Sequence, residues 1–83
     1  MHRDEAVVRL APGTRLTGPA VRAVDANGLT GDDGWTVATV PIESVEHAHD
    51  EFLRLGTAIE VLEPPELRAR ITATVTALAR TYA

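Results

Sequence analysis

The chain has 83 residues, enough for one domain with a thin core, because a chain of this size buries only about 60% of the surface exposed on unfolding. Cysteine is absent, which excludes disulfide bonds, thiolate metal sites and cysteine nucleophiles. All 8 basic residues are arginines, and with 12 acidic residues the net charge is −4. This charge argues against a broad basic surface that binds duplex nucleic acid. A local site in which arginine binds an anion is still compatible with it.

The first half of the sequence predicts three strands and one short helix. Alternating β-branched residues indicate strands, and a proline ahead of apolar residues at helical spacing indicates the start of a helix. Asp33-Gly34 is typical of the turn in a β-hairpin. In chain order, we expect a strand at 5–10, a helix at about 19–25, a strand at 29–30 and a strand at 35–42.

The second half predicts a helix, a strand and a longer helix. Ser44 is a typical N-cap for the first helix, and Gly56 is expected to end it. Residues 57–62 predict a strand, and Pro65 is well placed to begin the last helix. The apolar residues of that helix form one continuous face that we expect to pack in the core: Leu67, Ile71, Val75, Leu78 and Tyr82.

This order of elements predicts an α+β fold. The series β-α-β-β-α-β fits a ferredoxin-like (split βαβ) arrangement, in which helices cover one face of an antiparallel sheet, and the long C-terminal helix is an addition to it. We expect residues 1–83 to form this single domain.

Signals for secretion or membrane insertion are not evident. The N-terminal residues lack the apolar core of a signal peptide, and no window approaches the ~20 apolar residues that span a bilayer. We therefore expect a cytoplasmic protein without membrane partners.

One cluster, residues 43–51, contains the residue types of a metal or acid–base site. His47 and His49 are two residues apart and would point away from each other on a helix, whereas paired zinc ligands on a helix are three or four apart. Acidic residues near a helix N-terminus also complement the helix dipole, so a solvated helix face is the favoured interpretation, and we expect no metal site. The pairs with helical spacing are Glu43 or Glu51 with His47, and Glu46 with Asp50.

Most of the residues that nucleophilic catalysis requires are missing. Ser44 is the only serine and is explained as an N-cap, and no lysine is present to complete a phosphate-binding loop. We therefore predict no catalytic residues, no cofactor and no enzyme activity. The alternative, a small dimeric α+β enzyme, would have to use His47 and His49 as its bases.

The three aromatic residues are expected to have packing roles. Phe52 and Tyr82 fall on apolar helix faces and are predicted to lie in the core. Trp35 begins a strand after a tight turn, where packing in the core or at the sheet edge is favoured over a stacking platform for nucleic acid.

Three arginines, Arg22, Arg54 and Arg68, are candidates for contact with a ligand. The helix dipole explains a cation near the end of a helix, as at Arg54. Arg68 lies in the first turn of the last helix, where the same dipole disfavours a cation, so it needs an anionic partner. We expect a salt bridge to Glu63 or Glu66, with an external anion as the alternative.

Residues 37–82 resemble a known family. In that family an apolar helix ends near an Arg-Leu-Gly sequence, an alternating strand follows, and a proline begins the closing helix. The run resembles the C-terminal extension, or WCX domain, that follows the WYL domain in bacterial transcriptional regulators and has a ferredoxin-like fold. The residues that carry the resemblance are Phe52-Leu53-Arg54-Leu55-Gly56, Ile59-Glu60-Val61-Leu62-Glu63-Pro64, Glu66-Leu67-Arg68 and Tyr82.

The resemblance implies that the chain is part of a larger regulator. Such proteins place a winged helix-turn-helix first, a WYL domain next and this extension last, and the sequence contains neither of the first two. It implies a role in homodimerisation and in sensing a ligand such as a nucleic acid, a nucleotide or a small anion, while the upstream helix-turn-helix contacts DNA. Arg54 and Arg68 match family arginines in sequence pattern.

Two further expectations follow. If the domain forms a homodimer, the predicted surface is the edge or the uncovered face of its sheet, since a sheet with helices on one side leaves the other side open. The second hypothesis is a stand-alone ferredoxin-like regulatory domain that binds a small molecule or anion in a pocket lined by Arg22, Arg54 or Arg68.

Overall fold

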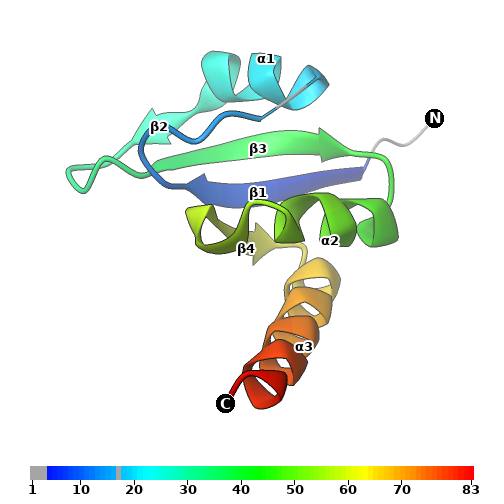
Figure 1. Cartoon of the computed structure of the whole chain (residues 1–83). Coiled ribbons are helices and arrows are strands. Elements are labelled where there is room, and N and C mark those ends of the chain that lie inside the picture. Colours follow the sequence, from blue (N-terminus) through cyan, green and yellow to red (C-terminus); the bar gives the residue numbers. More distant parts are fainter. Residues whose placement is uncertain (1–3, 17) are drawn as a thin grey trace.

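The computed structural model describes residues 4–16 and 18–83, which form a four-stranded antiparallel sheet and three α-helices (Figure 1). The predicted α+β class, the antiparallel sheet and the C-terminal helix are therefore confirmed. A short 3-10 turn, Gly56–Ala58, precedes the last strand. In chain order the elements are β1 (Asp4–Leu10), α1 (Pro19–Asn27), β2 (Leu29–Thr30), β3 (Thr36–Ile42), α2 (Val45–Leu53), β4 (Ile59–Glu63) and α3 (Pro65–Thr81).

The sheet has the strand order β2-β3-β1-β4, with β1 paired to β3 along its whole length and to β4 on its other side. Strand β2 pairs only two residues with β3, and the side chain of Asn27 extends the pairing beyond it. The Asn27 amide donates to the Thr39 carbonyl at 3.0 Å and accepts from the Thr39 N–H at 2.8 Å. Asn27 thus takes the place of a further strand residue at the edge of β3.

The core lies on one face of the sheet, against α1 and α2. Alternation along each strand sends every second side chain to this face, as with Ala38 and Val40 of β3. Helix α1 packs against it through Ala20, Ala23 and Val24, and Phe52 of α2 is buried as expected. The buried side chains are Ala6, Val8, Leu10, Ala38, Val40, Ala48, Phe52, Val61 and Leu67.

Local sequence signals set several element boundaries. The Ser44 hydroxyl accepts from the His47 N–H at 3.0 Å, which confirms the N-cap, and α3 begins at Pro65 as predicted. Helix α2 ends at Leu53, before the expected stop at Gly56. Gly56 instead adopts a positive φ of 59° and opens the 3-10 turn, which removes the first two residues from the strand predicted at 57–62.

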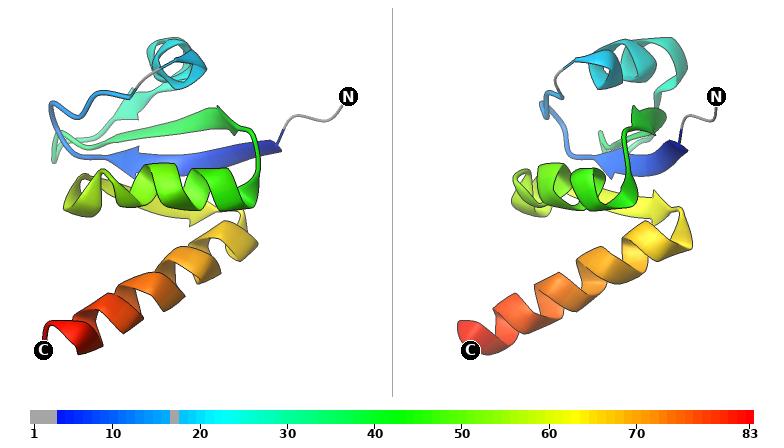
Figure 2. Two further views of the ribbon diagram at one scale, coloured as in Figure 1. Left: turned by 45° about the vertical axis from the view of Figure 1, so that its right-hand side comes forward. Right: turned by 90° about the vertical axis from the view of Figure 1, so that its right-hand side faces the viewer.

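Helix α3 packs at its start and projects from the domain at its end (Figures 1 and 2). Leu67 is fully buried and Ile71 is half-buried, but Val75 and Leu78 are 50% and 48% exposed and Tyr82 is 84% exposed. The expectation that the whole apolar face, including Tyr82, lies in the core is therefore wrong beyond Ile71. The reason is direction: after its first turns α3 runs obliquely away from α2 and β4, so that its C-terminal half extends past both (Figure 2).

No helix in residues 4–16 and 18–83 has the combination of length and apolar character needed to cross a membrane.

Candidate functional site

Two arginines converge on Glu60 on the sheet face opposite the core. Arg9 of β1 and Glu60 of β4 are register partners, so their side chains lie on the same face, and Arg9 Nε donates to Glu60 Oε1 at 3.1 Å. Arg68 of α3 reaches the other carboxylate oxygen, Oε2, at 3.2 Å, and also donates to the Val61 carbonyl at 2.8 Å. The hydrogen bond from Arg68, followed by that from Arg9, holds the pKa of Glu60 below its ordinary value.

Trp35 lies at one end of this network. The Arg9 guanidinium lies over the Trp35 ring, 4.2 Å from its centroid, and Arg9 Nη1 is 3.3 Å from Asp33 Oδ2. The other Asp33 oxygen accepts from the Trp35 N–H at 2.9 Å. Trp35 is half-buried and lies outside the buried core cluster. The cation–π contact and the ion pair, both made by Arg9, connect the hairpin turn before β3 to β1.

The expected partner of Arg68 is wrong. Its salt bridge is to Glu60 in β4, whereas Glu63 and Glu66 were the predicted partners. Residues two apart on a helix point about 160° away from each other, so Glu66 and Arg68 face different sides of α3. Glu60 lies on the side toward which Arg68 points.

A groove of about 240 Å³ lies between α2, β4 and α3, beside this network. Its walls are mainly apolar and include Phe52, Leu53, Ile59 and Val75, while Arg68 and Glu60 supply charge. Of the three arginines singled out in the sequence, Arg68 is the one that lines the groove.

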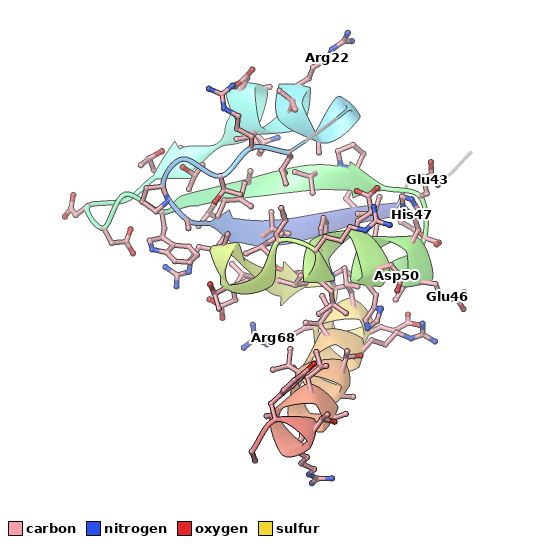
Figure 3. The ribbon with its side chains drawn as sticks, in the orientation of Figure 1. Arg22, Glu43, Glu46, His47, Asp50 and Arg68 are labelled. Carbon is pink, nitrogen blue, oxygen red and sulfur yellow. The ribbon has the colours of Figure 1, made fainter. Side chains whose placement is uncertain are left out.

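The structure does not bring Arg22, Arg54 and Arg68 together. Arg22 is exposed on α1 and points away from the sheet, at the opposite side of the domain from Arg68 (Figure 3). Arg54 is exposed and occupies the C-cap position of α2, where its charge suits the helix dipole. A ligand contact by any of the three stays a prediction.

The two histidines of α2 face different surroundings. His47 Nε2 lies 3.8 Å from Glu43 and 3.6 Å from Glu51, which are the two partners that helical spacing predicts. His49 is only 20% exposed at its side chain and connects α2 with α3, since its ring nitrogens lie 2.9 Å from Asp50 Oδ1 and 2.7 Å from Thr74 Oγ1. Within the described part of the chain, no three His, Asp or Glu side chains are grouped so that they could hold a metal ion.

These contacts place a mainly apolar groove beside a charged cluster of Arg9, Glu60 and Arg68. Residues 2–79 of the chain match the model of the WCX domain. The chain belongs to the WCX domain family. The match confirms the resemblance inferred from residues 37–82 and extends it over the first strand and helix of the domain. No curated protein matches the sequence.

The sequence alone did not indicate that Arg9 pairs with Glu60 and contacts Trp35, or that His49 connects two helices. Arg9 and Glu60 do occupy alternate positions of apolar strands, which marks them as residues of the exposed sheet face. Their pairing depends on the register of two strands about fifty residues apart, and no local signal encodes it.

The Glu60 network gives a pH-dependent contribution to stability. A carboxylate with a lowered folded-state pKa stabilises the fold above its unfolded pKa of about 4.5, and this contribution is lost as the pH falls through the folded-state pKa. We expect Glu60→Gln to lower the free energy of unfolding at pH 7 by at most about 1 kcal/mol, because the ion pairs are part-exposed. The difference between the two proteins should be constant from pH 7 to pH 6 and shrink below pH 4.5.

Urea unfolding followed by the fluorescence of Trp35, the single tryptophan, measures this difference. Glu66→Gln is the matched control, since Glu66 is exposed on α3 and points away from the network. A Glu60→Gln difference that stays the same at pH 7 and pH 3.5 would contradict the assignment.

Proposed function

We propose that this WCX domain is the C-terminal regulatory and dimerisation module of a WYL-type helix-turn-helix transcriptional regulator. The family match over residues 2–79 carries the proposal. The strand order β2-β3-β1-β4, with the element order β-α-β-β-α-β, supports a ferredoxin-like arrangement followed by an additional helix. Residues 1–83 are then one domain of the regulator, and its function is binding, with no catalytic step.

DNA recognition is assigned to a helix-turn-helix domain outside these residues. The net charge of −4 disfavours duplex binding by this domain alone, because such binding depends on the neutralisation of phosphates. Its own contribution is a contact with a second copy of the regulator and the sensing of a ligand, for which a nucleotide or another small anion is the favoured class.

The ligand half of the proposal depends on one observation. Arg68 lines an apolar groove and has guanidinium nitrogens beyond the Nη1 that binds Glu60 and Val61. A planar guanidinium with several donors suits a carboxylate or phosphate group. The same observation favours the second candidate, a stand-alone domain that binds a small anion.

Sedimentation equilibrium of the chain over the micromolar to millimolar range tests the dimerisation half. We expect a monomer–dimer equilibrium within this range. A strict monomer at every concentration would contradict dimerisation and leave the second candidate, a stand-alone anion-binding domain. A nucleotide or amino acid that raises the melting temperature of the chain would then support that candidate.

A further inference from the structure

The exposed half of α3 is unusual for a helix in contact with solvent. Val75, Leu78 and Tyr82 are three of the five large apolar side chains that are exposed in the described part of the chain. Residues 71–79 contain no charged side chain on any side of the helix, although 24% of the whole chain is charged. A solvated helix face normally carries charged and polar residues, so this segment has the composition of a buried one.

The exposed apolar ridge lies next to the groove. Val75 belongs to both features, because it lines the groove and begins the exposed stretch that continues through Leu78 to Tyr82. On the other side, Phe52 and Leu53 at the end of α2 form the opposite wall. One surface of the domain therefore presents a ridge and a recess of similar chemistry side by side.

This combination is what a twofold-symmetric contact requires. In such a contact the same patch is used twice, so it must be complementary to itself, with a ridge that fits the recess of its copy. Tyr82 is seven residues beyond Val75 and so about 10 Å further along the axis. Two α3 helices that cross near Val75 would each carry Leu78 and Tyr82 across to the groove of the other copy.

We propose that α3 of a second copy of this chain packs on the apolar part of the groove between α2, β4 and α3, at Phe52, Leu53 and Val75, in a twofold dimer whose helices cross near Val75 and leave Arg68 at the charged end for the anion proposed above. The proposal rests on the dimerisation proposed above and specifies its surface. The absence of charge over residues 71–79 favours an identical helix as occupant, since two such segments approach without like-charge repulsion and need no complementary charges.

The size of the surface sets the expected affinity. A patch about 25 Å long, the length of α3, and about 20 Å wide, the width of two helices, covers on the order of 500 Å² in projection. This is below the ~800 Å² that each partner buries in a standard interface, so we expect dissociation at micromolar concentration or above.

Sedimentation equilibrium of matched α3 variants tests the surface. Val75→Glu with Leu78→Glu places charge on the ridge and should weaken dimerisation at least 100-fold, because a carboxylate would be buried without a partner. Ala73→Glu with Ala77→Glu adds the same charge to the same helix on its other side and should change the dissociation constant less than threefold. All four positions are exposed, and far-UV circular dichroism checks that each variant is folded.

Disulfide crosslinking provides a second measurement. Because the chain has no cysteine, Val75→Cys introduces a single thiol close to the proposed axis, and mild oxidation should link it to its copy. Ala73→Cys on the far side of the helix is the control and should stay monomeric on a non-reducing gel.

The outcomes separate this proposal from the one on which it rests. If Val75→Glu/Leu78→Glu dimerises as tightly as the unmodified chain, α3 is not the interface, although dimerisation itself stands. Loss of the dimer on Leu29→Glu, which charges an exposed residue of β2, would place the contact on the sheet instead. Equal weakening by both α3 double variants would also overturn the proposal, and a strictly monomeric unmodified chain would overturn both.

Discussion

Replacement of Leu67 with alanine is expected to lower the free energy of unfolding by about 3 kcal/mol, within the range of 2–5 kcal/mol for buried leucines. Leu67 is 0% exposed and is the largest fully buried side chain of the described residues. It is also the one residue of α3 that is buried, so it holds the helix to the core. In a domain of this size, 1 kcal/mol corresponds to about 4–8 °C, which predicts a decrease in melting temperature of roughly 12–24 °C.

Leu78→Ala is the matched control for this prediction. It removes the same atoms from the same helix, but Leu78 is 48% exposed, so we expect a loss below about 1 kcal/mol. Both variants should be unfolded in urea at a concentration low enough to keep the chain monomeric. Equal losses for the two leucines would show that the projecting end of α3 packs as firmly as its start.

The contrast between Leu67 and Leu78 shows how far the sequence alone could predict α3. Periodicity places both residues on one face of a helix, and that face is confirmed for Leu67. Periodicity gives the direction of a side chain around the axis, but it does not give the extent of the neighbouring elements. The N-terminal half of α3 contacts α2 and β4, whereas the C-terminal half extends past them, and this depends on the tertiary arrangement of all three.

The candidate site could be predicted even less. The elements that carry it follow from local signals: the alternation of β1 and β4 and the proline at the start of α3. Its chemistry follows from pairings between them. Glu60 receives Arg9 from a strand 51 residues earlier and Arg68 from the following helix, while the sequence pointed to nearer acidic residues. Local rules favour short-range partners, and the sheet register supplies long-range ones.

Gly28, at the junction of α1 and β2, has no space for a side chain, and both its own helix and strand β3 cause this. As part of an Asn-Gly pair it predicts a turn, and glycine in turns is usually required for a positive φ. Here φ is −66°, which any residue can adopt. The requirement is space: a Cβ atom at this position would lie 2.5 Å from the Val24 carbonyl oxygen and 2.9 Å from Thr36 Cγ2.

Gly28→Ala is therefore expected to lower the free energy of unfolding by about 1–3 kcal/mol, as for overpacked sites. The Val24 carbonyl cannot withdraw easily, because it accepts the Gly28 N–H at 2.8 Å, and Asn27 anchors the same end of α1 to Thr39. Gly31→Ala is the matched control: its Cβ would lie 3.3 Å from Asp33 Oδ1, so this atom would have to shift by only a few tenths of an ångström. Urea unfolding should show a clear loss for Gly28→Ala and less than about 0.5 kcal/mol for Gly31→Ala. If Gly28→Ala were neutral, α1 would have to shift against β3, and the contact of Asn27 with Thr39 could not be as tight as its two hydrogen bonds indicate.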